Sequence, residues 1–155
     1  MKKSEQATDP FDGITLVTKP SKGFLGPRQL RDYRAHREGC IDWLLHFGKD
    51  PDEATGYAFK TVENRAARMD MFYRFVWDGE GRYTTRLTHE HAHEWMKHHV
   101  RRDTSNADKS SHRKATMMLY KWLHHERGLD PWEPEFSFSR SNQTTTPRDY
   151  LTRDE

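Results

Sequence analysis

The sequence predicts an all-α protein, a four-helix domain between a flexible N-terminal arm and a C-terminal linker. Four separate stretches repeat apolar residues at three- and four-residue steps, the period of one face of a helix. No stretch before Gly128 alternates apolar and polar residues with the two-residue period of a strand. A length of 155 residues suits one domain of this kind with its two flanking segments.

The N-terminal part is expected to comprise the arm and a first helix. Residues 1–26 contain scattered Pro and Gly and no sustained period, which predicts a flexible arm. Pro27 suits the first position of a helix, and an apolar stripe then runs from Leu30 to Leu45. We expect the helix to end near Gly48, where turn-forming residues follow.

Three further helices and a linker are expected downstream. The second helix is predicted over Phe59–Trp77, ending at the glycines that follow Trp77. The third starts after Thr88, a favourable N-cap residue. The fourth is predicted over Asp108–Arg127 and ends at Gly128, so that the helical domain covers 27–128. Residues 129–155, rich in Pro, Ser and Thr, are predicted to be a linker.

Composition limits the classes of protein that remain. The single cysteine, Cys40, excludes an internal disulfide framework and a zinc site built from cysteines, which suits a reducing compartment such as the cytoplasm. No apolar run approaches the ~18 residues of a membrane span. With 33% hydrophobic and 32% charged residues, but 5 Trp and 8 Phe, the core is expected to contain few, large side chains.

Positive charge is concentrated in the middle of the chain. The formal net charge is only +2, but residues 82–102 carry five basic and two acidic side chains, and residues 105–127 carry the same numbers. Residues 128–155 carry six acidic and three basic side chains. The third and fourth helices are therefore expected to be the electropositive part of the molecule.

The sequence His89-Glu90-His91-Ala92-His93 matches the His-Glu-x-x-His pattern of zinc peptidases. The match falls in the first turn of a short helix, no downstream third ligand of compatible spacing follows, and five of the eleven residues from His89 to His99 are histidine. We therefore expect neither a bound metal nor a cofactor, and zinc hydrolase activity is the third-ranked hypothesis.

Two groups of basic and short polar residues are expected at helix N-termini. Unpaired backbone N–H groups and the helix dipole favour a phosphate there, and short hydroxyls can donate to it. We predict that both groups contact the backbone of duplex DNA. The group on the second helix is Lys60, Thr61, Asn64, Arg65 and Arg68, and that on the fourth is Lys109, Ser110, Ser111, Arg113 and Lys114.

Four segments together resemble a known family. Residues 61–76 (TVENRAARMDMFYRFV) resemble the first helix of the core-binding domain of tyrosine recombinases, and residues 87–96 (LTHEHAHEWM) resemble its short third element. Residues 110–123 (SSHRKATMMLYKWL) are similar to its last helix. Residues 147–155 (PRDYLTRDE) resemble the junction at which the family's catalytic domain begins. The likeness covers about residues 56–155 and is greatest to archaeal phage-type integrases.

The resemblance implies a four-helix, SAM-like core-binding domain that forms the non-catalytic half of a C-shaped clamp on duplex DNA. It implies double-stranded DNA and the catalytic domain of the same protein as partners, with self-association on DNA. The family's catalytic residues belong to the second domain, so no residue of this chain, Tyr150 included, is expected to be catalytic. The alternative function is a helical protein-interaction module that uses an exposed edge of Met71, Phe75, Met117 and Tyr120.

Overall fold

The computed structural model describes residues 11–138, which form five helices and no β-strand. Four of the helices are long, and their order and approximate positions agree with the sequence pattern. The all-α class is therefore confirmed. The helices are α2 (Lys19–Phe24), α3 (Pro27–His46), α4 (Phe59–Glu80), α5 (His89–Arg101) and α6 (Asn106–Arg127).

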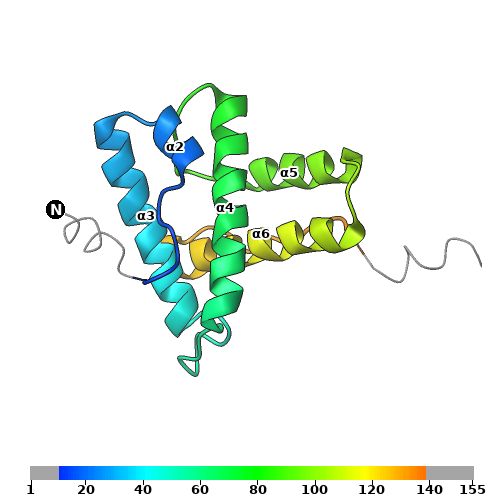
Figure 1. Cartoon of the computed structure of the whole chain (residues 1–155). Coiled ribbons are helices and arrows are strands. Elements are labelled where there is room, and N and C mark those ends of the chain that lie inside the picture. The colour runs from blue at the N-terminus through cyan, green and yellow to red at the C-terminus, as the bar shows by residue number, and fades with distance from the viewer. Residues whose placement is uncertain (1–10, 139–155) are drawn as a thin grey trace, which may run out of the picture.

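The long helices form two antiparallel pairs that cross one another (Figure 1). α3 and α4 run in opposite directions, and α5 and α6 form the second pair across them. α4 packs against each of the other three long helices, so it is the central element of the fold. Because α4 packs against α6, residues of these two helices that are about fifty positions apart in sequence can lie side by side.

The predicted apolar faces form the core. The apolar residues that recur at three- and four-residue steps on α4 and α6 are buried: Val62, Ala66, Met69, Phe72, Tyr73 and Val76 on α4, and Ala115, Met118, Leu119, Trp122 and Leu123 on α6. On α5, Ala92, Trp95 and Met96 are buried, whereas Val100 is 46% exposed. Tyr33, Trp77 and Tyr73 pack edge to face or at a tilt, with ring centroids 4.8 to 6.1 Å apart. Large aromatic side chains thus fill much of the core, together with aliphatic residues and methionines.

Capping explains where the helices begin and end. The Thr88 hydroxyl accepts a hydrogen bond from the His91 backbone N–H, and the His91 ring accepts one from the Thr88 N–H, as a glutamate does in a conventional capping box. α4 continues three residues beyond the predicted end at Trp77, because a single glycine in the last turn is tolerated. It ends when Gly81 adopts a left-handed conformation, with φ 75°.

Residues 11–25 do not form the flexible arm that the sequence predicts. Ile14, Leu16 and Val17 are buried in the core, and the six-residue helix α2 follows them. These three apolar residues recur with neither the period of a helix nor that of a strand, so the sequence pattern did not predict that they would be buried. The remainder of the predicted arm, residues 1–10, lies outside the described residues.

Two buried charged residues hold this N-terminal segment in place. Asp70 of α4 is fully buried and accepts hydrogen bonds of 2.7 Å from the hydroxyls of Thr18 and Ser21. Arg37 of α3 is 2% exposed and donates from Nε to the Leu16 carbonyl over 2.8 Å and from Nη2 to the Thr15 carbonyl over 3.1 Å. These contacts satisfy polar groups that the buried segment would otherwise leave unpaired.

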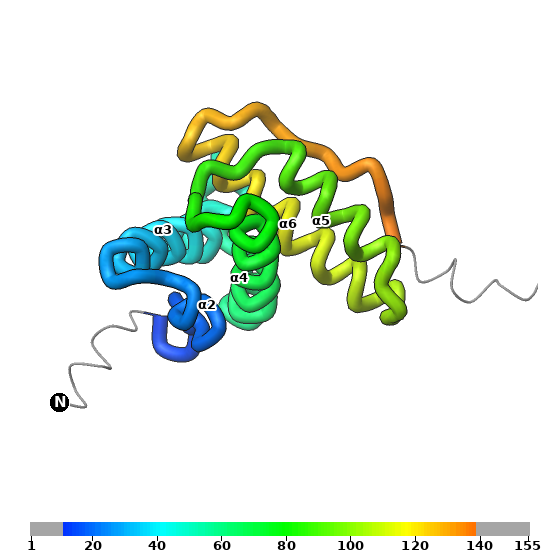
Figure 2. The backbone as a smooth tube through the Cα atoms, turned by 90° about the horizontal axis from the view of Figure 1, so that it is seen from above, coloured from blue at the N-terminus to red at the C-terminus, as the bar shows by residue number. Residues whose placement is uncertain are grey.

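The start of the predicted linker is also packed. Residues 129–138, here called the C-terminal segment, run along the outer side of α5 and α6 (Figure 2). Trp132 is only 7% exposed, and its ring lies 5.2 Å from that of Tyr120. The rest of the predicted linker lies outside the described residues.

Gly56 is required by a close approach of two backbones. A Cβ atom at this position would lie 1.7 Å from the carbonyl oxygen of Leu45, near the C-terminal end of α3. We expect Gly56→Ala to lower the free energy of unfolding by about 1–3 kcal/mol, since the loop has to move. Urea denaturation of the full chain measures this change. Gly79→Ala is the matched control.

A Cβ at Gly79 meets no atom within 4 Å, and this residue lies inside α4. The control is therefore expected to raise the free energy of unfolding by about 0.5–1 kcal/mol. Equal effects of the two substitutions would contradict the steric explanation for Gly56.

Candidate nucleic-acid interface

Residues predicted on α4 and α6 come together at one surface hollow. The α4/α6 hollow is defined here by six lining residues and has a volume of about 230 Å³. Thr61 and Arg65 project from α4, and Lys114 lies opposite them on α6. The crossing of the two helices thus joins parts of the two predicted groups. The lining residues are Tyr57, Thr61, Arg65, Lys114, Met117 and Met118.

The positive charge of Arg65 is not neutralised by the described part of the protein. Partial burial and then the neighbouring Arg68 guanidinium lower the pKa of Arg65. Neither Arg65 nor Lys114 forms an ion pair with a carboxylate among residues 11–138, and the Arg65 Nε is buried without a hydrogen-bond acceptor. An anion in this hollow would relieve both the desolvation and the repulsion.

The N-terminus of α4 has orphan backbone donors. Its N-cap residue, Ala58, has no side chain that can accept a hydrogen bond from the first turn. Lys60 and Asn64 are exposed in the first turns of this helix, and Lys60 lies 3.3 Å from Glu63. This helix end therefore offers the donors and the dipole that the sequence analysis expected.

The N-terminus of α6 is occupied from within. The Ser105 hydroxyl caps the Asp108 N–H, and the Asp108 carboxylate lies in the first turn, where it offsets the helix dipole. The same carboxylate lies 3.1 Å from Arg102 and 3.8 Å from the predicted DNA-binding residue Arg68. A phosphate at this helix end would have to compete with Asp108, so we place the favourable anion position farther along α6.

The C-terminal segment contacts two more of the predicted residues. The Arg113 Nε donates to the carbonyl oxygen of Phe136 over 2.8 Å, which leaves the terminal nitrogens of the guanidinium for other acceptors. Lys109 lies over the ring of Phe138, 6.0 Å from its centroid, and donates to the Val100 carbonyl over 3.4 Å. Ser110 and Ser111 are half-buried on α6 between these two residues.

Lys121 is a basic residue that the predicted interface omitted. Its ammonium lies 5.7 Å from the centre of the Tyr57 ring and donates to the Lys49 carbonyl over 3.3 Å. In sequence it stands between two aromatic residues, Tyr120 and Trp122. Because both neighbours are buried, Lys121 has to face outward.

The histidines of the His-Glu-x-x-His match contact the C-terminal segment. His89 Nε2 lies 2.9 Å from the carbonyl oxygen of Asp130, and His93 Nδ1 lies 4.0 Å from a Glu135 carboxylate oxygen. Among residues 11–138, no group of three or more His, Cys, Asp or Glu side chains is placed to hold a metal ion. Both imidazoles are half-buried rather than lying at a free helix edge.

The four residues of the alternative protein-binding edge do not form one surface. Met71 and Met117 are exposed, but Tyr120 is buried and donates its hydroxyl to the Thr88 carbonyl. Phe75 packs against Trp95 of α5, with ring centroids 4.8 Å apart. An interaction module would therefore need a different set of contacts.

Comparisons with protein families, curated proteins and solved structures found no match to this chain. Within residues 11–138, no helix has the length and apolar character needed to cross a membrane.

Proposed function

We propose that this chain is the DNA-binding, non-catalytic half of a site-specific tyrosine recombinase of the integrase type. It binds one face of duplex DNA with the N-terminal half of α4 and the adjoining surface of α6. The SAM-like core-binding fold, the catalytic domain in the same protein and self-association on DNA are parts of this proposal. The function of the isolated chain is binding, without strand cleavage.

One observation carries the proposal. Arg65 and Lys114, which come from different helices and have no carboxylate partner among the described residues, line the same hollow. Lys and Arg side chains supply the phosphate contacts of DNA-binding proteins, and these two can pair with a phosphate without first breaking an internal ion pair. Arg113 extends this surface along α6, and the uncapped start of α4 adds backbone donors.

The order of the elements gives the second support. The helices that resemble parts of the family's core-binding domain are α4, α5 and α6, and they precede the junction-like residues 147–155 in the chain. The likeness concerns the segments that build the proposed DNA face. A helical protein-interaction module remains the alternative function and is one outcome of the following test.

We expect the full chain to bind duplex DNA weakly and with strong salt dependence, because half a clamp neutralises few phosphates. Dissociation constants in the non-specific range of about 10⁻⁴–10⁻⁶ M are expected. The double variant Arg65→Gln with Lys114→Gln should lower the slope of log affinity against log salt by about 1.8, since each lost phosphate contact removes about 0.9. Fluorescence anisotropy of a labelled duplex at several salt concentrations measures this slope.

The control is Arg28→Gln with Arg31→Gln, two exposed arginines on α3. This pair changes the net charge by the same amount at a distance from the proposed interface. The slope should remain that of the unmodified chain. Equal losses in both double variants would leave only diffuse attraction, and the absence of any salt-sensitive DNA binding would favour the protein-interaction function.

A further inference from the structure

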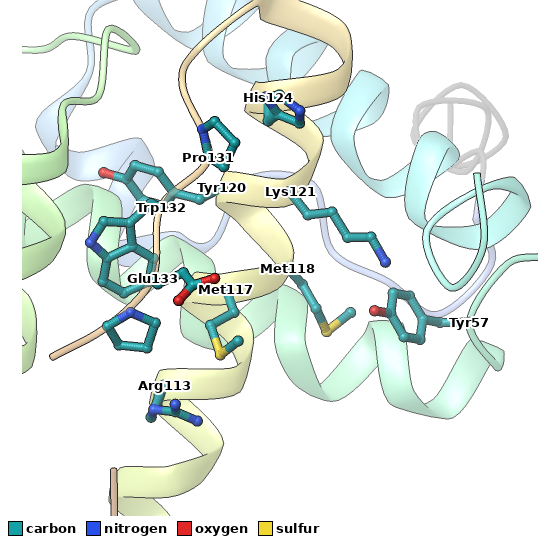
Figure 3. A pocket seen from close by; sticks show the side chains of 11 residues that line it. Tyr57, Arg113, Met117, Met118, Tyr120, Lys121, His124, Pro131, Trp132 and Glu133 are labelled. Carbon is teal, nitrogen blue, oxygen red and sulfur yellow. The ribbon is translucent and has the colours of Figure 1, made fainter. Parts of the chain in front are cut away.

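A second hollow lies beside the proposed DNA face, between α6 and the C-terminal segment. This segment hollow has a volume of about 520 Å³. Figure 3 shows its three sides, with α6 in the middle, Pro131, Trp132 and Glu133 on one side, and Tyr57 on the other. Met117 and Met118 are shared with the α4/α6 hollow, so the two hollows adjoin.

The floor of the segment hollow is apolar. Met117 is 37% exposed, and Met118 and Trp132 border it. The flexible thioether of methionine adapts to apolar partners of different shape. The hollow therefore offers a place for one or two apolar side chains that approach from solvent.

The rim of the segment hollow is cationic. Arg113 and Lys121 line it, and neither forms an ion pair with a carboxylate among residues 11–138. Lys114, on the adjoining hollow, adds a third uncompensated charge. Glu133 is the acidic residue among the lining side chains. Apolar floor and cationic rim together fit a short acidic segment with an apolar anchor.

The chain itself carries a segment with this chemistry. Within residues 139–155, the large apolar side chains are Tyr150 and Leu151. Residues 149–155 contain three acidic side chains and one basic side chain, a net charge of −2. The negative charge and the two apolar side chains thus occur together within residues 149–155.

The length of the intervening chain permits contact. Phe138, the last described residue, lies against Lys109 in the first turns of α6. The distance along the helix from Lys109 to Lys121 is about 18 Å, at 1.5 Å per residue. Residues 139–148 can span up to about 33 Å when extended, which is enough to return along α6.

We infer that the segment hollow binds residues 149–155 of the same chain, with Tyr150 and Leu151 on the methionine floor and the acidic side chains beside Arg113 and Lys121. This contact does not depend on DNA binding. Because Arg113 belongs to the proposed DNA face, the bound segment would place acidic side chains next to that face.

Methyl NMR of the full chain with ¹³C-methyl methionine tests this inference. The double variant Tyr150→Ser with Leu151→Ser should shift the methyl signals of Met117 and Met118, because the ring current of Tyr150 is lost. Met71 is an internal control, since it is exposed on α4 outside either hollow. The buried Met69 and Met96 report whether the fold is unchanged.

A charge reversal at the rim gives a second, independent measurement. Lys121→Glu should release the segment and abolish the further effect of the Tyr150 and Leu151 substitutions on Met117. Arg28→Glu on α3 is the matched control and should leave that effect intact. Unchanged Met117 and Met118 signals in the Tyr150 and Leu151 double variant would overturn the inference. Shifts that vanish on dilution would also overturn it, because they would assign the contact to a second copy.

Discussion

Asp70→Ala is expected to lower the free energy of unfolding by about 3–5 kcal/mol, the range for removing one partner of a buried charged network. The Asp70 carboxylate accepts from the hydroxyls of Thr18, Ser21 and Tyr33 and from the Arg74 guanidinium, with all four distances between 2.7 and 3.0 Å. Removing it leaves three hydroxyls without this acceptor.

The same substitution should release the N-terminal segment specifically. The hydroxyls of Thr18 and Ser21 join residues 11–24 to α4. Within the described residues, Asp70 is the one side chain that accepts a hydrogen bond from either hydroxyl. Hydrogen exchange in α2 should therefore increase more than exchange in α5. Urea denaturation gives the total free energy, and exchange mass spectrometry locates the loss.

Two further variants separate the causes. Asp70→Asn keeps one carbonyl acceptor and loses the charge that faces Arg37, so an intermediate effect is expected. Asp42→Ala removes an exposed carboxylate of α3 that lies 3.3 Å from the exposed imidazole ring of His46, and a change below about 0.5 kcal/mol is expected. A loss below 1 kcal/mol for Asp70→Ala would show that the segment is held by its apolar residues and by the hydrogen bonds from Arg37 rather than by Asp70.

The second large effect is acid unfolding driven by buried neutral histidines. Burial, and then the charge of Arg127, lowers the pKa of His36 to about 4. Burial and the stacked neighbour His112, 4.2 Å away between ring centroids, lower the pKa of His99 to about 3. Burial also lowers the pKa of His112 to about 4, although the Asp108 carboxylate opposes the shift.

The direction of the pH effect follows from proton binding. Unfolded histidines take up protons near pH 6.5, whereas these three remain neutral in the folded state until the pH approaches 4. Their stabilising effect is thus complete above about pH 6.5 and is lost as the pH falls through this window. Each histidine kept neutral contributes a slope of about 1.4 kcal/mol per pH unit.

Asp70 adds to the loss at lower pH. Burial opposes ionisation, but Arg37 and the hydroxyl donors of Thr18, Ser21 and Tyr33 outweigh it and lower the pKa of Asp70. Its contribution is therefore present above the ordinary carboxyl range near 4 and is lost below it. Asp70 and the three buried histidines therefore all lower the free energy of unfolding as the pH falls. We expect the chain to be folded at pH 7 and to unfold with a midpoint of about pH 4–5.

Circular dichroism during urea denaturation, repeated from pH 4.5 to pH 8, measures the slope. His36→Gln should lower it by about 1.4 kcal/mol per pH unit, and the amide oxygen can still accept the Tyr73 hydroxyl that contacts His36. His46→Gln, a substitution of an exposed histidine on α3, controls for the change of residue. A free energy of unfolding that is constant between pH 4.5 and pH 7 would refute the explanation.

Local sequence determined the helices of this protein. The apolar stripes of α4 and α6, the Thr88 cap and the left-handed Gly128 all act over four residues or fewer, so they are visible in the sequence alone. The predicted inward faces of these two helices are buried as expected. Arg37, four residues after the buried Tyr33 and four before the buried Ile41, is buried on the same face of α3.

Only the tertiary structure decided which contacts each basic residue makes within the protein. In sequence, Arg65, Arg68, Arg113 and Lys109 are equivalent basic residues near helix starts. In the fold, Asp108 lies 3.8 Å from Arg68, and the C-terminal segment contacts Arg113 and Lys109. Arg65 instead meets Lys114 at a hollow without a carboxylate partner among the described residues.

The packing of the N-terminal segment was likewise decided by the tertiary structure and not by local sequence. Its three buried apolar residues have no period, and the carboxylate that anchors it lies 49 positions beyond Ser21. Helix formation depends on neighbours along the chain, whereas the partners of a charge or of an aperiodic segment depend on how helices cross. The sequence by itself therefore determined the helices and their inward faces, and the crossing of α4 with α6 decided the surface that they present.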